Sequence, residues 1–356
     1  MITSILRTYG IADFASADPI ASGLINRTWK ITSGSNQYIL QRINDHVFKK
    51  PYQLAENIKM IDDYLAEHFP GYLFAAPLSN VNKDGIVHIK GEGYFRLFPF
   101  IKGSHTISVV ESPQQAFEAA LHFGKFTNLL SGFDSSRLYS TIPDFHNLTL
   151  RYKQFEEAIE TGNKTRIKQS APLIAAIKEH NHILDSFEKI QKSRQVKKRV
   201  THHDTKISNV LFDDDGMGIC VIDLDTVMPG YFISDVGDMM RTYLSPASEE
   251  EKDFTKIEVR EDFFRAIVQG YLSNMKDELT EEERGLILYA GLFLIYMQAI
   301  RFLADYCNND SYYGASYEEH NFVRAGNQIA LLERLEEKGS KLEEIISAEL
   351  KVHSQN

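Results

Sequence analysis

The sequence predicts an α+β fold of two lobes, a small β-rich amino-terminal lobe and a larger, mainly helical carboxy-terminal lobe. Short apolar runs separated by glycine-containing turns fill roughly the first hundred residues, which is typical of a small sheet. From about residue 111 onward, apolar residues recur at spacings of three and four, which is typical of helices. The length of 356 residues also fits two units, since a domain holds roughly 150 residues.

The amino-terminal lobe, expected over residues 1–98, is predicted to contain a hairpin, one helix and two further strands. The runs "TWKITSG" and "QYILQRI" flank a turn at Gly34, Ser35 and Asn36, which predicts the hairpin. "PYQLAENIKMIDDYLAEHF" opens with Pro51 and repeats apolar residues at helical intervals, which predicts the helix. "GIVHIKGEGYFRLFPF" supplies the two further strands.

The carboxy-terminal lobe, expected over residues 99–356, is predicted to be helical with one β insert. "LFPFIKG", residues 97–103, is the predicted bridge between the lobes, and Ser112 and Pro113 mark the first helix start. The insert is the stretch from residue 201 to residue 226. Further helices are predicted at about residues 147–160, 164–193, 249–276, 279–306 and 321–350.

Charge and cysteine content exclude several classes of partner. Lysine and arginine total 39 and aspartate and glutamate total 49, and the net charge of −10 repels nucleic acid and anionic membranes. Two cysteines are too few for a disulfide scaffold or a zinc site. The most apolar segment, residues 286–306, contains Gln298, Arg301 and Asp305, and it is expected to be a buried core helix. We expect a cytoplasmic protein, a monomer or weak homodimer, that binds small molecules and neither nucleic acid nor a membrane.

The stretch "THHDTKISNVLFDDDGMGICVIDLDT", residues 201–226, predicts a group of oxygen ligands at one end of a hairpin. "NVLF" and "ICVID" are short apolar runs, and "DDDGMG" between them has the chemistry of a turn. Antiparallel pairing then brings Asp204 and Asn209, before the first strand, beside Asp223 at the end of the second. Asn209 and Asp223 offer the oxygen ligands that Mg²⁺ prefers, and Asp204 is left free to act as a base.

The series His203, Asp204, Asn209 and Asp223 resembles the catalytic loop and metal-binding segment of protein kinases. With "HHD" for "HRD" and "DLD" for "DFG", the chain more closely resembles the aminoglycoside phosphotransferase-like small-molecule kinases, and among these the N-acetylhexosamine 1-kinases. The resemblance implies a bilobal protein-kinase-like fold, and it extends from residue 22 to residue 325. The stretches that carry it are "SGLINRTW", "YILQRIN", "RLFPFIKG", "HDTKISNVLFD", "VIDLDTVMPG", "DVGDMMR" and "RFLADY…YY…HNFVRA".

The resemblance implies an enzyme that transfers the γ-phosphate of ATP to the anomeric hydroxyl of an N-acetylhexosamine. Asp204 would take the proton from the attacking hydroxyl, while Asn209 and Asp223 would hold Mg²⁺ against the nucleotide phosphates. Lys206 would reach the transferred phosphate, although a solvated loop lysine is the alternative. His203 is expected to brace the loop from a buried position.

On the nucleotide side, "ASGLINRTW" takes the place of a glycine-rich loop. Gly23 would lie at its turn, and Asn26 and Thr28 would donate to phosphate. No Gly-x-x-x-x-Gly-Lys-Ser/Thr pattern is present, which argues against a P-loop enzyme. In "RLFPFIKG", Phe98 and Phe100 would form apolar walls around adenine, and an ordinary strand between lobes is the alternative.

The strand "YILQRI" contains no lysine, although kinases use a strand lysine to contact the phosphates. Gln41 and Arg42 point to opposite faces, so only one of them can face the nucleotide. Arg42 is preferred because it carries the required charge and could pair with Glu56 on the following helix. A motif match anchored on Leu40 favours Gln41 instead.

On the acceptor side, we expect Arg301 to contact the sugar, with Tyr312 or Tyr313 stacking on the ring or its acetamido group. An arginine within an apolar helix must be paired or face an opening. His202 is expected to be a surface residue or a sugar contact, and Asp225 to bind a second metal ion or the sugar.

In "DVGDMMR", Asp235, Asp238 and Arg241 would order the loop or contact sugar hydroxyls, and a structural ion pair between Asp238 and Arg241 is equally expected.

Two other functions stay open from the sequence. One is a kinase of another small hydroxyl compound, such as an amino alcohol, a hydroxy amino acid or an aminoglycoside. A positively charged acceptor of this kind would need a strongly acidic site. The other is a catalytically silent nucleotide-binding protein, which the missing strand lysine favours and the complete set of Asp204, Asn209 and Asp223 disfavours.

Overall fold

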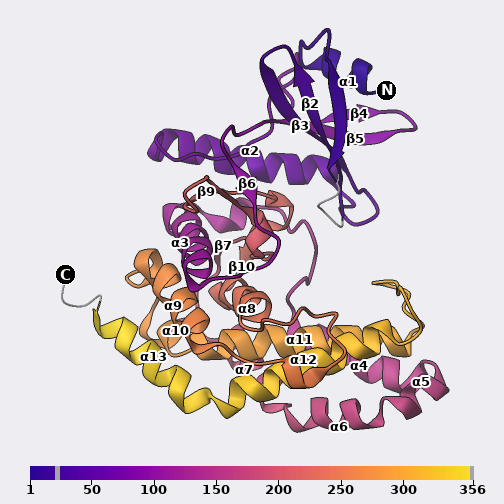
Figure 1. The fold of residues 1–356 in the computed structure, drawn as a ribbon, viewed down its shortest axis with the longest axis vertical. Coiled ribbons are helices and arrows are strands. Elements are labelled where there is room, and N and C mark those ends of the chain that lie inside the picture. Colours follow the sequence, from indigo (N-terminus) through magenta and orange to yellow (C-terminus); the bar gives the residue numbers. More distant parts are fainter. Residues whose placement is uncertain (21–24, 353–356) are drawn as a thin grey trace.

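A computed structural model describes residues 1–20 and 25–352 of the chain, which form a sheet lobe above a helical lobe in Figure 1. The sheet has five antiparallel strands in the order β1-β2-β3-β5-β4. The predicted hairpin is confirmed as β2 and β3. The strands are β1 (Ser16–Ile20), β2 (Arg27–Ser33), β3 (Asn36–Ile43), β4 (Val87–Ile89) and β5 (Gly93–Pro99).

The two faces of this sheet have different partners. The outer face carries Leu40 and Leu97, which pack with Ile5 of a short helix that the sequence did not predict, α1 (Ile2–Thr8). The inner face carries Ile43, which joins the core of α2 (Pro51–His68), the helix predicted to open at Pro51. Because side chains alternate along a strand, Gln41 shares the inner face with Ile43, and Arg42 shares the outer face with Leu40.

The carboxy-terminal lobe is helical, and α11 runs through its centre (Figure 1). The side chains of Ser112 and Gln115 form a capping box at the predicted start of α3. The helices are α3 (Pro113–Leu129), α4 (Leu148–Thr161), α5 (Lys164–Gln169), α6 (Ala171–Glu179), α7 (His182–Lys192), α8 (Phe232–Tyr243), α9 (Glu261–Met275), α10 (Glu281–Arg284), α11 (Ile287–Cys307), α12 (His320–Glu337) and α13 (Gly339–Val352).

Four helix predictions were too long, and two of them, 279–306 and 321–350, each divide into two helices, α10 with α11 and α12 with α13. The segment at 164–193 is divided into α5, α6 and α7, with breaks at Ser170 and at His180 and Asn181. The segment predicted from residue 249 becomes regular helix only at Glu261. Before it, the Asp253 carboxylate accepts hydrogen bonds from its near neighbour Thr255, a local bond that competes with helix formation.

Helix α11 is a core helix, as the sequence predicted. Its length and mean hydropathy of 1.7 would suit a membrane span, but 78% of the apolar window lies buried inside the protein. It packs against α4, α8 and α12.

The predicted β insert is confirmed, and its strands place the polar residues of the loop together. The insert pairs β8 with β9 in an antiparallel hairpin, with the turn at residues 213–217. Asp204 and Asn209 precede the first of these strands, and Asp223 follows the second. The small strands of this lobe are β6 (His105–Thr106), β7 (Arg199–Thr201), β8 (Val210–Phe212), β9 (Gly218–Val221) and β10 (Met228–Gly230).

Candidate active site

The loop that contains Asp204 is anchored to α8 by two buried carboxylates. Asp235 accepts hydrogen bonds from the backbone N–H groups of His202, at 3.0 Å, and His203, at 2.7 Å. Asp238, one helical turn later, accepts from the N–H of Thr205 at 2.8 Å. The loop backbone is therefore fixed by charge-assisted hydrogen bonds on one helix face, which confirms that α8 orders the loop.

Asp238 also forms the predicted ion pair with Arg241, at 2.9 Å. Glu249 pairs with the same guanidinium at 2.8 Å, so Arg241 is enclosed between two carboxylates. These contacts give the two α8 side chains a structural role in holding the loop.

The two histidines before Asp204 are both internal. His203 is 5% exposed with a left-handed backbone (φ 67°), and its Nδ1 lies 3.1 Å from the carbonyl oxygen of Thr201. Burial lowers the pKa of His203 to about 4, so the ring is neutral and braces the loop as predicted. His202 is fully buried, with Nε2 at 3.0 Å from the carbonyl oxygen of Ile222. The prediction of a surface or sugar-contacting His202 is wrong because this ring joins the loop to the end of β9.

Asp204 is partly exposed and lies beside an amide and an ammonium group. The Asn209 Nδ2 donates to the Asp204 carbonyl oxygen at 2.9 Å and to its Oδ2 at 3.1 Å. The Lys206 Nζ lies 3.4 Å from Oδ1. The negative charge of Asp204 raises the pKa of Lys206, which therefore remains an ammonium ion at neutral pH.

Asp223 is an uncompensated carboxylate. Its backbone is left-handed (φ 58°), a conformation that costs a non-glycine residue roughly 1–3 kcal/mol and is common at functional sites. Solvent reaches the side chain, yet the surrounding protein excludes much of the bulk water. This loss of water, followed by the charges of Asp225 and Asp204, raises the pKa of Asp223 to about 7.

These residues fit a divalent cation. Within residues 1–20 and 25–352, the Asp223 carboxylate has no ion pair or hydrogen bond, and the Asn209 Oδ1 has no hydrogen bond. Two oxygen ligands on neighbouring segments, with excess negative charge around them, suit Mg²⁺, whose other ligands are usually water and phosphate oxygens. The prediction that Asn209 and Asp223 hold the metal is therefore consistent with their placement.

Asp225 connects the two lobes and does not face an open site. It is 2% exposed; its Oδ1 lies 2.5 Å from Nη1 of Arg96, and its Oδ2 accepts from the Asn26 Nδ2 at 2.7 Å. The structure thus differs from the prediction that Asp225 binds sugar or a second metal, since residues from the sheet lobe occupy both oxygens. Asn26 likewise contacts this carboxylate in the place of the predicted phosphate.

Arg96 is a residue that the sequence reasoning missed. Its Nε and Nη2 donate to the Oε1 of Gln41, at 3.1 and 2.9 Å. The two residues are register partners on β5 and β3 and share the inner face of the sheet. A charged residue within the apolar run "GYFRLFP" was the available signal, because a buried arginine must have a partner.

The preference for Arg42 is not supported by the structure. Arg42 lies on the outer face of β3, where it crosses over Gly93. A Cβ atom added to Gly93 would lie 3.2 Å from the Arg42 Nε. Glu56 is exposed on α2, and no ion pair joins it to Arg42 within the described chain. Strand alternation instead directs Gln41, the alternative, toward Arg96 and the other lobe.

The remaining predicted nucleotide contacts lie near this face. Thr28 accepts a hydrogen bond from the Gln41 amide at 3.4 Å. The Phe98 ring lies 5.0 Å from the Arg96 guanidinium carbon. Phe100 lies beyond the end of β5, where its ring is 4.2 Å from the Lys30 ammonium. Gly23 lies outside the described residues, and the adenine-wall role of the two phenylalanines stays a prediction.

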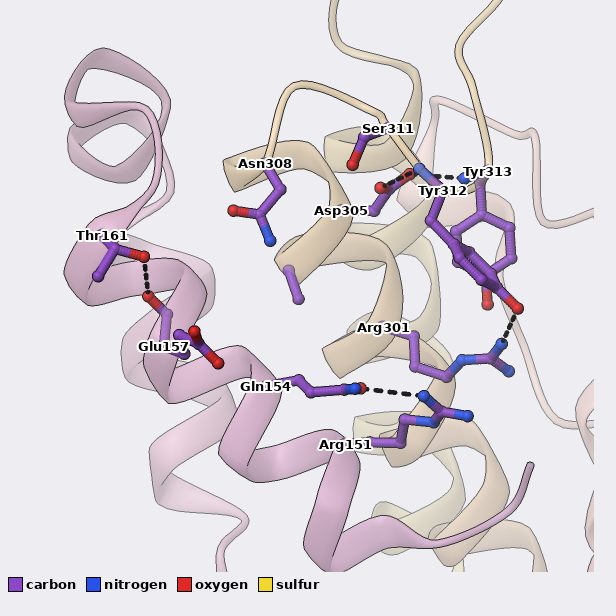
Figure 2. A pocket seen from close by; sticks show the side chains of 11 residues that line it. Arg151, Gln154, Glu157, Thr161, Arg301, Asp305, Asn308, Ser311, Tyr312 and Tyr313 are labelled. Carbon is purple, nitrogen blue, oxygen red and sulfur yellow. Dashed lines mark hydrogen bonds between the residues drawn. The ribbon is translucent and has the colours of Figure 1, made fainter. Parts of the chain in front are cut away.

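Arg301, Tyr312 and Tyr313 are brought together at a cavity of about 380 Å³ (Figure 2). The Arg301 guanidinium lies 5.7 and 5.3 Å from the two tyrosine rings. Asp305 fixes the tyrosine segment by accepting the backbone N–H of Tyr312 and Tyr313, at 2.7 and 2.9 Å. The lining comes from α4, α11 and the segment after α11 and comprises Arg151, Gln154, Glu157, Thr161, Arg301, Ala304, Asp305, Asn308, Ser311, Tyr312 and Tyr313.

Arg151 of α4 is the second arginine in this cavity, and no sequence signal marked it. Burial and the nearby charge of Arg301 lower the pKa of Arg151. In the described part of the chain, neither arginine forms an ion pair with a carboxylate. Two guanidinium groups therefore line one cavity without an ion-pair partner, and the carboxylates of Glu157 and Asp305 line it too.

A stacked aromatic pair links this cavity to the loop that carries Asp204. The Phe145 and His146 rings stack at 4.4 Å. Phe145 lies 5.5 Å from the Arg301 guanidinium, and His146 lies 5.3 Å from the His203 ring. The cavity wall and the residue before Asp204 are thus connected through this stacked pair.

Comparisons with known structures agree with this architecture. A microcompartment-associated aminopropanol kinase is 16% identical, with a TM-score of 0.64 over 96% of this chain and 97% of that one. An aminoglycoside phosphotransferase from Alicyclobacillus acidocaldarius is 12% identical, with a TM-score of 0.63 over 96% and 95%. A spectinomycin phosphotransferase in complex with ADP and spectinomycin is 15% identical, with a TM-score of 0.58 over 94% and 97%.

At these identities the structural likeness shows the fold, and it confirms the predicted α+β, protein-kinase-like arrangement of two lobes. Membership follows from the sequence match. The family model described as "Phosphotransferase enzyme family" matches residues 16–280, more than half of the chain. That span includes both the sheet lobe and the loop that carries Asp204, Asn209 and Asp223. The chain therefore belongs to the phosphotransferase enzyme family.

Proposed function

We propose that the protein is an ATP-dependent kinase that phosphorylates the anomeric hydroxyl of an N-acetylhexosamine. The observation that carries the kinase assignment is the grouping of Asp204, Lys206, Asn209 and Asp223 around one hairpin end. Family membership and the ADP-bound spectinomycin phosphotransferase support a nucleotide as phosphate donor. The resemblance of the sequence to N-acetylhexosamine 1-kinases supports the sugar.

In the proposed reaction, the acceptor oxygen forms a bond to the γ-phosphorus as the bond from that phosphorus to the ADP oxygen breaks. Asp204 accepts the proton of the acceptor hydroxyl. Lys206, held as an ammonium ion beside Asp204, stabilises negative charge on the transferred group. Asn209 and Asp223 would hold Mg²⁺, which neutralises phosphate charge when bound. The α8 carboxylates keep the loop in position for this transfer.

The charge of the acceptor-side cavity favours an uncharged sugar over a cationic amino alcohol. Arg151 and Arg301 equal in number the lining carboxylates, Glu157 and Asp305, whereas a cationic acceptor would need a carboxylate excess. Guanidinium groups and tyrosine rings suit hydroxyl, acetamido and ring-face contacts. A kinase for amino alcohols is the second candidate only because similar structures include an aminopropanol kinase and a choline kinase.

An acceptor panel tests the proposal. The wild-type protein is incubated with ATP and Mg²⁺ together with N-acetylglucosamine, N-acetylgalactosamine, glucose, choline, aminopropanol or kanamycin, and ADP release is followed. The proposal expects turnover with at least one N-acetylhexosamine well above that with the amines. Turnover confined to amines would exclude the sugar, and no turnover with any acceptor would favour the silent nucleotide-binding protein.

The role of Arg301 has its own test. Arg301→Ala should raise the KM for the sugar about 10- to 100-fold, the loss of one charge-assisted contact, and leave the KM for ATP unchanged. The matched control is Arg334→Ala, which removes an exposed arginine from α12 that pairs with Glu337. Equal effects of the two substitutions on the sugar KM would remove Arg301 from the acceptor site.

A further inference from the structure

We propose that Arg96 of β5 binds the nucleotide phosphates from the sheet lobe, in place of the strand lysine that β3 lacks. This proposal rests on the proposed kinase function and assigns its missing phosphate-side cation. Arg42 is unsuited because it lies on the outer face of β3. On the inner face of β2, β3 and β5, as far as the structure describes them, the cationic side chains are Lys30 and Arg96.

The position of Arg96 distinguishes it from Lys30. The Lys30 ammonium lies 4.2 Å from the Phe100 ring, at the end of the sheet that leads into the bridge. Arg96 instead contacts Asp225, two residues after the metal-binding candidate Asp223. Arg96 is therefore the inner-face cation that acts on the metal-binding segment.

The guanidinium is held by Gln41 on one side and by an ion pair with Asp225 on the other. Gln41 accepts from Nε and Nη2, which fixes the plane of the group. Nη1 lies 2.5 Å from the Asp225 carboxylate but has no aligned hydrogen bond there. A phosphate presents negative charge and paired oxygens, as a carboxylate does, and it can replace Asp225 on the guanidinium fork.

Arg96 is 2% exposed, so nucleotide binding must include this exchange of partners. Asp225 then gives up Arg96 to the phosphate and remains joined to the sheet lobe through Asn26. The Arg96 guanidinium thereby changes its partner from Asp225 to a nucleotide phosphate. No covalent bond is made or broken in this step.

Binding of ADP and adenosine without Mg²⁺ tests the assignment, because adenosine lacks the phosphates. Calorimetric titration of Arg96→Gln should show ADP affinity about 10- to 100-fold below wild type, with adenosine affinity unchanged. Arg42→Gln is the matched control, an arginine of the same sheet on the outer face, and should change neither affinity. Asp225→Asn removes the competing negative charge and should bind ADP more tightly, with adenosine unchanged.

Several results would overturn the assignment. Equal losses of ADP and adenosine affinity in Arg96→Gln would leave Arg96 a purely structural role. A phosphate-selective loss in Arg42→Gln would transfer the role to Arg42. If circular dichroism shows that Arg96→Gln does not fold, the Asp225→Asn variant tests the proposal instead. ADP binding by Asp225→Asn that is unchanged or weaker than that of wild type would contradict the exchange of partners.

The same titrations separate this proposal from the proposed function. A wild-type protein that binds neither nucleotide would remove both. The expected pattern of ADP and adenosine affinities, without phosphorylation of any sugar in the acceptor panel, would keep Arg96 as the phosphate contact and remove only the sugar kinase.

Discussion

The hairpin of β8 and β9 and the inner face of the sheet differ in whether their charged side chains have partners. At the hairpin, Asp223 has no ion-pair partner in the described chain, and its pKa is raised to about 7. On the sheet, Arg96 is fully enclosed, and its charge is matched by Asp225. An uncompensated charge contributes little to folding but can bind a cation, whereas an enclosed ion pair is costly to break. Substitutions at the hairpin should therefore reduce activity with little change in stability, whereas substitutions at the sheet contact should reduce stability in addition to any effect on nucleotide binding.

The largest expected effect on activity is that of Asp204→Asn. The amide has nearly the same shape but cannot accept the proton, so kcat should fall about a thousandfold, within the usual range for a general base. The unfolding midpoint should stay within a few degrees of wild type, because Asp204 is partly exposed. Asp214→Asn, in the exposed turn of the same hairpin, is the matched control and should keep full activity. A kcat for Asp204→Asn near that of the control would remove the proposed base.

On the sheet side, Asp225→Ala should lower the free energy of unfolding by about 3–5 kcal/mol. The substitution leaves the buried Arg96 guanidinium without its counter-charge, which is the costly way to break an internal ion pair. Urea denaturation measures the effect, and Asp214→Ala, which removes an exposed carboxylate, should change the same quantity by less than about 0.5 kcal/mol. Equal values for the two variants would show that the contact between the lobes is dispensable.

The free energy of unfolding should depend on pH through Asp235, the carboxyl group that holds the loop before the hairpin. Burial raises the pKa of Asp235 to about 7, against the opposing effect of the two loop N–H groups. A raised carboxyl pKa favours the folded state at low pH, and this stabilisation is lost as pH rises from about 4 to 7. The stability of Asp235→Asn relative to wild type should therefore increase across that window, by about 2–4 kcal/mol. A relative stability that decreases with pH would mean that the N–H groups outweigh burial.

The smallest effect is expected for Asn57, a second contact between the lobes. Its amide accepts from the Tyr139 N–H and donates to the Tyr139 carbonyl, each at 2.8 Å, and lies 3.3 Å from the Val227 carbonyl. Asn57→Ala should lower the free energy of unfolding by about 1–2 kcal/mol, the cost of leaving buried polar groups without partners. Lys59→Ala on the exposed side of α2 is the control. No difference between the two would place the stability of the interface elsewhere.

The hairpin could be predicted from sequence because its determinants are local. The turn residues at 213–217, the apolar runs on either side and the spacing of Asp204, Asn209 and Asp223 all lie within one short stretch. The position of Asp204 at its end follows from antiparallel pairing alone.

The sheet contact could not be predicted in the same way. "YILQRI" has apolar side chains on both faces, Ile39 and Ile43 on one and Leu40 on the other, so alternation alone does not show which face meets the second lobe. The pairing of Arg96 with Asp225 and the meeting of Arg151 with Arg301 depend on tertiary packing of segments far apart in the chain. His202 was assigned to the surface or to the sugar because nothing nearby in sequence reveals the Phe123 ring against which it packs.

Phosphorus NMR of the product formed from N-acetylglucosamine or N-acetylgalactosamine, ATP and Mg²⁺ tests the central claim most directly. The proposed function predicts a sugar monophosphate whose phosphorus couples to the anomeric proton, formed by wild type and absent with Asp204→Asn. A phosphate on another hydroxyl, or no sugar phosphate while an amine acceptor is converted, would contradict it.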